Sequence, residues 1–364
     1  MFINSNDVEE IIRIVDGNYA NRTVVLMIAE TDMPNINSLT DKLNRKDIKF
    51  IGGIFPQVIY GNNVYDSGVV IKFIQNEVST LVMNNIKDKN YTIPELDFDK
   101  TKNYCAFTFI DGLTGNISYF LSELYRKFGN NCSYLGGGAG SLSLQQKPCV
   151  FDNQGFYMDT AITIVFESNV SIGVKHGWKK IEGPIIATKT DKNVIQELNW
   201  RNAFEVYKEV IQSDIKTELR QDNFFDIAKA YPFGMLKANA ECIVRDPIAT
   251  NEKGELICVG EIMENTAVDV LKGEKDNLIN SAKAAAEDAI NGVTEIRDVL
   301  VIDCISRVLF LEQDFKKELD NVLAIINSKD NDASISGALT LGEISSYHGF
   351  LEFLNKTLVI GVFS

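Results

Sequence analysis

The sequence predicts an α+β protein of mixed β-sheets flanked by helices, built from repeated β-α-β-β units in two closely packed halves. One observation behind this prediction is internal repetition, because three segments share one order of parts. Another is patterning, because continuous apolar runs alternate with amphipathic stretches. A third is size, since 364 residues exceed one ordinary hydrophobic core and indicate about two domains.

The chain begins with a predicted helix within residues 1–20, with Val8, Ile11, Ile12 and Val15 on one side. The first repeated segment follows from about residue 23. The run TVVLMIA is bounded by polar residues and predicts a buried strand. A short helix, the glycine-containing run FIGGIF, a loop and the strand GVVIKFI complete the segment.

The second segment spans residues 104–166 and repeats this order. Its first strand, CAFTFI, ends at Asp111 and Gly112. Asn116 is the expected N-cap of a helix with one apolar stripe, and Gly129 is the expected stop signal. The glycine-rich run YLGGGAGS, a longer loop and the strand AITIVF follow.

The third segment spans residues 299–363. VLVID is its first strand, and the following helix carries Phe315, Leu319 and Val322 on one face. The run SISGALTLGE, a loop and the closing strand TLVIGVF complete the pattern. The closing strands of the three segments are similar, which favours related structural units.

A different region separates the second and third segments. VSIGVKHGW and PIIATKTDKNVIQEL are predicted to be paired strands, and residues 202–214 have helical periodicity. CIVRDPI and LICVGEI, separated by the turn TNEKGE, predict a hairpin. An alanine-rich helix is expected at residues 282–290.

Charge and composition exclude some classes of binding partner and indicate the cellular compartment. The net charge of −14 repels phosphate backbones and anionic lipid head groups, so neither nucleic acid nor a membrane is expected as a partner. Six scattered cysteines without a CxxC pair are typical of a reducing compartment. The N-terminus lacks a signal-peptide pattern and no apolar run reaches membrane length, so we expect a cytoplasmic protein.

The glycine run Gly136, Gly137, Gly138 and Gly140 has two interpretations. Glycines let the backbone approach a ligand closely, and they also permit tight packing of two chain crossings. A phosphate loop requires a lysine after the last glycine, and Ser141 interrupts the dinucleotide-binding fingerprint. No cofactor is therefore predicted.

The second candidate cluster is Asp303, Cys304, Ser306 and Arg307, where the first strand of the third segment gives way to its helix. Open α/β sheets place ligands at such strand ends. Arg307 suits a carboxylate, and Asp303 suits an ammonium or a hydroxyl group. The alternative is an Asp–Arg pair that braces the helix start, with Ser306 as N-cap.

Two further acids lie where a strand of the second or third segment ends. Asp111 ends the first strand of the second segment, and Glu343 follows the glycine-containing strand of the third. If the segments stack around a shared cleft, Asp111, Asp303, Arg307, Glu343 and the glycine run converge there.

The sequence contains two histidines, His176 and His348, and neither has acidic or cysteine neighbours at metal-ligand spacing. No metal site is therefore predicted. A Cys304–His176 thiol–imidazole pair would indicate an enzyme, whereas a buried apolar cysteine is the alternative. Trp178 is a candidate for stacking on a ligand or for packing at a domain interface.

These motifs together resemble the FIST domain family. LGGGAGS is similar to the family's GGGAGD motif, KHGW to its G-H-x-W stretch, CISR to its C-x-x-R motif and LNKT to its H-N-x-T ending. LGEI resembles its G-E segment, and IVRDP places Arg245 at its V-R pair. The chain departs from the pattern at Ser141, Asn199 and Leu354, where the family usually carries Asp, Asp and His.

The resemblance implies a FIST N-terminal domain at residues 1–190 and a FIST C-terminal domain at 191–364. It implies a stand-alone sensory module that binds a small molecule, with amino acids suggested as ligands, and that signals through a partner protein. The predicted ligand-binding residues are Asp111, Gly136, Gly137, Gly138, Gly140, His176, Trp178, Arg245, Asp303, Cys304, Arg307 and Glu343. A protein-interaction adaptor without a ligand and a cysteine-dependent enzyme remain the alternatives, and the sequence favours a binding protein over an enzyme.

Overall fold

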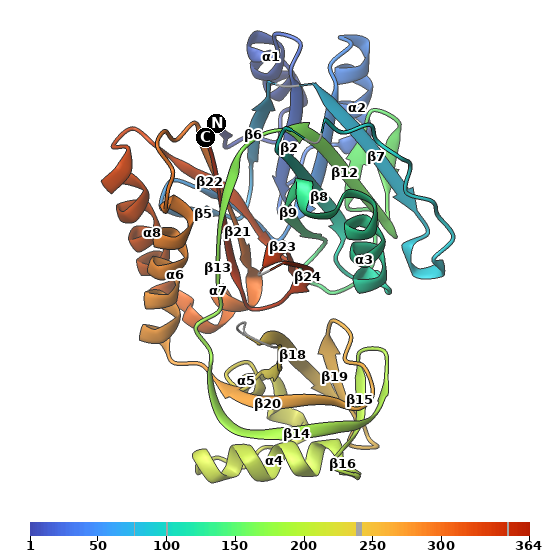
Figure 1. Cartoon of the computed structure of the whole chain (residues 1–364), viewed down its shortest axis with the longest axis vertical. Helices are drawn as coiled ribbons and strands as arrows, with labels where there is room; N and C mark the ends of the chain where they lie inside the picture. The colour runs from blue at the N-terminus through green and yellow to red at the C-terminus, as the bar shows by residue number, and fades with distance from the viewer. Residues whose placement is uncertain (76, 100, 238–241, 348) are drawn as a thin grey trace.

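The computed structural model describes residues 1–364 except residues 76, 100, 238–241 and 348. Its strands form four mixed or antiparallel sheets flanked by helices, which confirms the predicted α+β class. Figure 1 shows two bodies along the long axis. We call residues 1–175 with 275–364 the three-unit domain, and residues 179–272 the inserted domain.

Each predicted repeat is a structural unit made of a first strand, a helical connection, a second strand and a closing strand. Unit 1 consists of β2 (Thr23–Ala29), α2 (Ile36–Arg45), β3 (Phe50–Phe55) and β6 (Val69–Ile74). Unit 2 consists of β8 (Tyr104–Asp111), α3 (Ile117–Phe128), β9 (Cys132–Ala139) and β12 (Thr160–Glu167). Unit 3 consists of β21 (Asp298–Cys304), α7 (Ile305–Leu311), α8 (Phe315–Lys329), β22 (Ile335–Thr340) and β25 (Leu358–Phe363).

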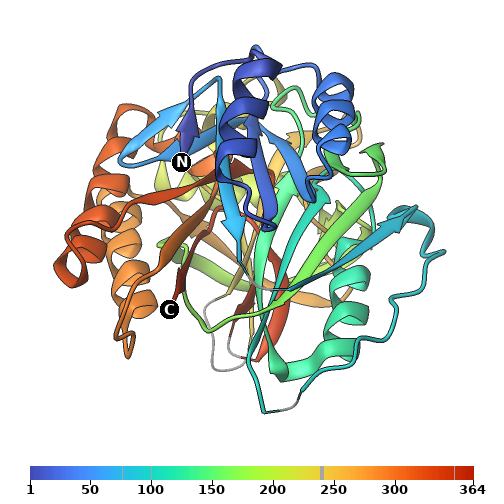
Figure 2. The same cartoon turned by 90° about the horizontal axis from the view of Figure 1, so that it is seen from above.

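The three units share one topology. In each, the second strand pairs parallel with the first, and the closing strand pairs antiparallel with the other side of the first. Figure 2 shows unit 1 in blue, unit 2 in green and cyan, and unit 3 in orange and red around a common centre. Met27, Phe107 and Leu300, from the first strands of the three units, line one small apolar cavity there.

A hairpin follows the second strand of each unit and pairs with the second strand of a different unit. β4 (Gln57–Tyr60) and β5 (Asn63–Tyr65) extend unit 3 at β22. β10 (Val150–Asp152) and β11 (Gly155–Tyr157) extend unit 1 at β3. β23 (Glu343–Tyr347) and β24 (Phe350–Leu354) extend unit 2 at β9. This cyclic exchange ties the beginning of the chain to its end.

The closing strand of each unit carries one more antiparallel strand at its free side. These strands are β1 (Phe2–Ile3), β7 (Val78–Asn84) and β13 (Val170–Lys175). Helix α6 (Lys275–Ile290) packs on β13, where a Cβ at Gly173 would overlap the Ala285 carbonyl oxygen. The close approach explains why an alanine-rich helix meets a glycine in the strand.

The inserted domain is an antiparallel sheet with two helices and a hydrophobic core of its own. Its strands are β14 (Lys179–Asp191), β15 (Val194–Leu198), β16 (Arg201–Asn202), β17 (Phe233–Met235), β18 (Ile243–Thr250), β19 (Leu256–Val259) and β20 (Thr266–Lys272). Its helices are α4 (Ala203–Asp214) and α5 (Phe224–Ala228). The predicted pairing of residues 170–178 with 184–198 is wrong, because β13 pairs with β25 whereas β14 pairs with β15.

Polar residues specify the helix starts. Asp7 and Asn35 accept hydrogen bonds from backbone N–H groups of α1 (Val8–Asn18) and α2. Asn116 occupies the N-cap position of α3 as predicted but makes no capping bond. Its φ is 62°, and its Nδ2 donates to the Lys87 carbonyl oxygen at 2.6 Å. The residue therefore anchors the turn to the preceding loop.

The predicted division at residues 190 and 191 stays a prediction. The sheets group the chain differently, because residues from both predicted halves build the three-unit domain together. The chain passes between the domains twice, between β13 and β14 and between β20 and α6. Lys179 pairs with Lys272, so the two crossings lie side by side.

Candidate functional site

A cleft of about 780 Å³ lies between the two domains and is lined by both. The three-unit domain contributes Gly112, Leu113, Thr114, Gly115, Leu142, Leu144, Cys304, Ile305, Ser306, Leu309, Leu341 and Asn355. The inserted domain contributes Lys192, Asn193, Phe225, Asp246, Ile248, Ala249, Cys258, Val259, Gly260 and Glu261. The size is that of a small-molecule site, and interfaces between domains are common places for one.

Strand ends supply one wall of the cleft. β8 ends at Asp111 and turns into Gly112, whereas β21 ends at Cys304 and leads into α7. Units 2 and 3 therefore bring equivalent strand ends to the same cleft, as expected for ligand sites in sheets with parallel strands.

A buried ion pair across the domain boundary lies at the bottom of the cleft, which we call its floor. Lys356 Nζ lies 3.1 Å from Asp246 Oδ2, and the two side chains are 0% and 1% exposed. Ser306 Oγ donates to the same carboxylate oxygen at 2.9 Å. Burial raises the pKa of Asp246, and the Lys356 ammonium opposes that rise. Asp246 Oδ1 has no hydrogen-bond partner within the described part of the chain.

A second cross-domain contact lies beside the ion pair. Arg245 Nη1 donates to the carbonyl oxygens of Val244 and Phe353, both at 3.0 Å, and to Asn355 Oδ1 at 3.3 Å. Burial lowers the pKa of Arg245 to about 10. Asn355 Nδ2 has no partner among the residues that the structure describes. The adjacent residues 245 and 246 thus contact the adjacent residues 355 and 356.

Arg307 lies behind the cleft wall in a fully buried network. Its Nε and Nη2 donate to the two carboxylate oxygens of Glu318 at 3.0 and 2.7 Å. Its Nη1 donates to the His176 carbonyl oxygen at 2.6 Å, and its Nη2 to that of Leu278 at 3.2 Å. Because the guanidinium already has protein acceptors, a ligand carboxylate would have to displace one of them.

Asp303 contacts the same guanidinium, with Oδ1 at 3.3 Å from Arg307 Nε. Burial, with Glu318 nearby, raises the pKa of Asp303 well above its usual range. This arrangement matches the alternative of an Asp–Arg pair that braces α7. Cys304 rather than Ser306 is the N-cap residue, and Ser306 instead bonds to Asp246.

Glu343 and Cys304 form a buried pair of acids. Glu343 accepts from Thr340 Oγ1 at 3.0 Å and from the Thr357 backbone N–H at 3.2 Å. Burial raises the pKa of Glu343 to about 8, while hydrogen bonds from Thr340 and Cys304 oppose the rise. Burial also raises the pKa of the Cys304 thiol well above its usual range. A thiol held in this form is a poor nucleophile at neutral pH.

Asp111 holds the turn that lines the cleft. Its Oδ1 accepts from the Leu113 backbone N–H at 3.0 Å. Its Oδ2 accepts from the Asp159 backbone N–H and from Gln146 Nε2, both at 2.7 Å. The carboxylate therefore connects the turn to the loop before β12.

The glycine run lies inside the sheet, where β9 pairs with β8 on one side and β23 on the other. A Cβ at Gly136 would overlap the Thr108 carbonyl oxygen, and one at Gly137 would lie 2.6 Å from Thr340 Cγ2. Gly138 N–H donates to the Gly342 carbonyl oxygen at 2.7 Å, and Gly140 N–H to that of Ile54 at 2.8 Å. This geometry matches the interpretation of tight packing.

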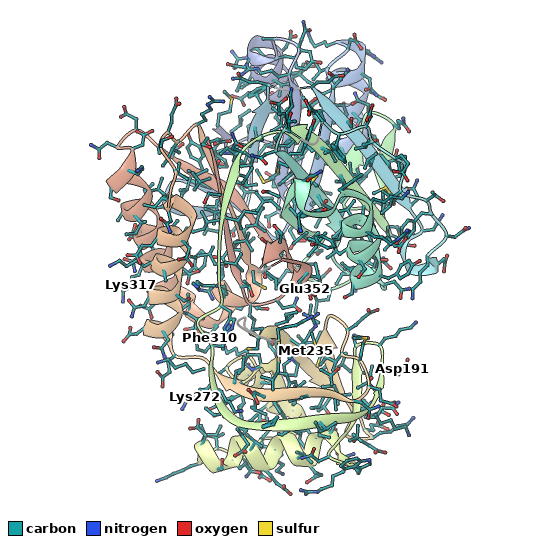
Figure 3. All side chains as sticks on the ribbon, viewed as in Figure 1. Asp191, Met235, Lys272, Phe310, Lys317 and Glu352 are labelled. Atoms are coloured by element: carbon teal, nitrogen blue, oxygen red, sulfur yellow. The ribbon has the colours of Figure 1, made fainter. Side chains whose placement is uncertain are left out.

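His176 and Trp178 lie at the crossing between the domains. His176 Nδ1 accepts from the Trp178 backbone N–H at 2.9 Å, and its Nε2 lies 3.6 Å from Cys242 Sγ. Burial, helped by the Arg307 charge, lowers the pKa of His176 to about 4. Trp178 packs against Phe310, which Figure 3 labels at the junction, with ring centroids 5.1 Å apart.

Among the residues predicted for the site, Cys304 is the one that lines the cleft within the described structure. Asp303 and Arg307 lie behind the wall, and the glycine run lies within the sheet. Ligand binding by these residues stays a prediction. His348 lies outside the described residues.

The sequence analysis missed Asp246, Asn355, Lys356 and Glu318 as members of these networks. Asp246 follows Arg245 in the IVRDP motif, and Asn355 and Lys356 belong to LNKT, so both motifs contained the signal. Glu318 lies among the apolar positions of α8, where an acid is unexpected unless it is paired.

Among the residues that the structure describes, no group of three His, Cys, Asp or Glu side chains is placed to hold a metal ion. No described helix combines the length and apolar character needed to cross a bilayer.

Comparison with known proteins identifies the family. A family model for the FIST N domain matches residues 10–201, and one for the FIST C domain matches residues 203–346. No curated protein matches the chain. The two family matches together cover nearly the whole sequence, so the chain belongs to the FIST domain family of sensory domains in signal transduction.

Proposed function

We propose that this protein binds a small organic ligand in the cleft between its domains and transmits the signal to a partner protein. The observation that carries the proposal is the cleft itself, which is lined by both domains and has a buried polar floor. A ligand that contacts both walls stabilises one relative position of the domains, and that change is what a partner can read.

The two crossings between the domains support this mechanism. They contain Gly177 and Gly273, and the second lies against the Trp178 ring. Gly177 has a φ of 79°, a conformation that side chains other than glycine rarely adopt. Two adjacent crossings of this kind form a hinge, and a cleft between hinged domains closes on its ligand.

An amino acid is the ligand class that the family resemblance implies. Lys192 and Glu261 line the cleft and carry opposite charges, which suit the carboxylate and ammonium groups of a zwitterion. Apolar side chains such as Leu309, Ile248 and Phe225 provide contacts for the remainder of a ligand.

A second candidate function is an adaptor that acts through protein contacts alone. One observation favours it: Trp200 and Met263 are 77% and 78% exposed, which is unusual for large apolar side chains. The Trp200 backbone N–H donates to Thr188 Oγ1, and the Asn265 backbone N–H donates to the Ala187 carbonyl oxygen. The segments that carry Trp200 and Met263 therefore border the same part of β14.

Thermal unfolding with a panel of amino acids and small organic acids tests the first function. Ligand that binds only the folded state raises the Tm by mass action. Ala249→Trp fills the cleft and should abolish the shift, whereas Ala267→Trp, another partly buried alanine in the same sheet, should retain it. No shift in the wild type across the panel would favour the adaptor.

A further inference from the structure

We propose that the floor of the cleft recognises a carboxamide, a neutral group that presents an N–H donor and a C=O acceptor. The inference rests on the proposed function, because it concerns what the same cleft binds. It specifies the ligand end that enters deepest, next to Asp246 and Asn355.

Two polar atoms at the floor lack partners. Asp246 Oδ1 is an acceptor and Asn355 Nδ2 is a donor, and neither forms a hydrogen bond within the described part of the protein. Both residues line the cleft and are 1% exposed. Leaving a buried polar group unpaired destabilises the folded state, so native proteins rarely retain one without a ligand or an ordered water.

The surrounding bonds fix which atom of each side chain is left without a partner. Asn355 Oδ1 accepts from Arg245 Nη1 at 3.3 Å, which assigns the other end of the amide as the nitrogen. Asp246 Oδ2 accepts from Ser306 Oγ and contacts Lys356 Nζ, which leaves Oδ1 available. Asp246 and Asn355 therefore belong to the two neighbouring contacts that join the domains at the floor of the cleft.

Charge at the floor disfavours an ionic ligand end. Asp246 is already paired with the Lys356 ammonium, and Arg245 is a second buried cation bonded to carbonyl and amide oxygens. A ligand ammonium would add a third positive charge to one carboxylate. A ligand carboxylate would place an acceptor against Asp246 Oδ1, where a donor is required.

A carboxamide satisfies both orphan atoms without adding charge. Its N–H donates to Asp246 Oδ1, and its C=O accepts from Asn355 Nδ2. Gly260 leaves room for this network, because a Cβ there would lie 3.0 Å from Arg245 Nε and 3.1 Å from Asn355 Oδ1.

Thermal unfolding is measured with hexanamide, hexanoate and 1-aminohexane, which carry a neutral amide, a carboxylate and an ammonium group on the same six-carbon chain. The comparison shows which charge and which hydrogen-bonding groups the cleft accepts. We expect hexanamide to raise the Tm of the wild type, and the two ionic analogues to leave it unchanged. Asn355→Asp replaces the donor by an acceptor and should remove the shift, whereas Asn37→Asp, an exposed site on α2, should retain it. Comparing hexanamide with hexanoate in the wild type decides the question even if Asn355→Asp does not fold.

The same measurement with L-glutamine and L-glutamate shows whether the amide that binds belongs to an amino acid or to a simple amide. A shift with L-glutamine alone supports a carboxamide carried on an amino acid, and a shift with hexanamide supports a simple amide. The proposal is overturned by a larger shift with hexanoate, 1-aminohexane or L-glutamate, which would leave the proposed function standing. It is also overturned if none of these compounds shifts the Tm, and the amino-acid panel then decides separately whether the cleft binds a ligand.

Discussion

Lys356 of the three-unit domain and Asp246 of the inserted domain place their charged groups 3.1 Å apart, in a pair that is excluded from solvent. Lys356 also donates to the Lys229 carbonyl oxygen at 2.9 Å and lies 4.8 Å from the centre of the Trp178 ring. The pair therefore connects the crossing between the domains with the floor of the cleft. A buried pair of this kind adds little net stability, because the cost of desolvating both charges offsets their attraction.

Lys356→Met should destabilise the protein strongly, because it leaves the Asp246 carboxylate buried without its cation. Breaking one side of a buried pair typically costs about 3–5 kcal/mol. Urea denaturation measures the change. Lys208→Met removes the cation of a solvent-exposed pair with Glu218, for which about 0–1 kcal/mol is expected. Equal effects of the two substitutions would contradict the assigned role of Lys356.

Gly177→Ala should destabilise the protein more than Gly292→Ala does. Both glycines have left-handed backbones, with φ of 79° and 75°, so both substitutions impose about 1–2 kcal/mol of backbone strain. A Cβ at Gly177 would also lie 2.5 Å from Ser281 Oγ, whereas nothing lies within 4 Å of one at Gly292. Unfolding midpoints measure the difference, and similar values for the two variants would contradict the packed hinge.

His176 should make the protein sensitive to mild acid. Its folded-state pKa of about 4 lies below the unfolded value of 6.5, so the unfolded state binds the additional proton between these values. The contribution of His176 to the free energy of unfolding is therefore fully present above pH 6.5. It is lost as the pH falls towards 4, by roughly 3 kcal/mol in total.

His176→Asn retains an acceptor for the Trp178 backbone N–H but does not titrate. The free energy of unfolding, measured at pH 7 and pH 4.5, should fall less in this variant than in the wild type. The same fall in both proteins would show that His176 does not titrate as described.

Gly136→Ala should prevent the second unit from assembling, because a Cβ there overlaps the Thr108 carbonyl oxygen of the neighbouring strand. Gly17→Ala is the control, since nothing lies within 4 Å of a Cβ at that position in α1. The control should gain up to about 1 kcal/mol from helix propensity. Thermal melts followed by circular dichroism separate these outcomes, and a native-like melt for Gly136→Ala would contradict the packing role of the glycine run.

The units were predictable because local patterns encode them. The run TVVLMIA has to be a buried strand, and the apolar stripe of residues 117–128 has to be a helix face. The exchange of hairpins was not predictable, because residues 57–60 pair with β22 through contacts that no local pattern records.

The candidate site was predictable only in part. The DCISR segment ends a strand at the cleft, as expected, but its charged residues turn inward, where Glu318 pairs with Arg307. The floor residues Asp246 and Lys356 become neighbours only because the inserted domain folds back on the three-unit domain. Long-range geometry of this kind follows from the assembled fold and is not readable from spacing.

The most direct measurement of the central claim is mass spectrometry of small molecules released from the purified protein by denaturation. The wild type and Ala267→Trp should release the same compound in a fixed ratio to protein, and Ala249→Trp should release none, since its side chain fills the cleft between the domains. Release of the same compound in the same amount from Ala249→Trp would contradict ligand binding in this cleft.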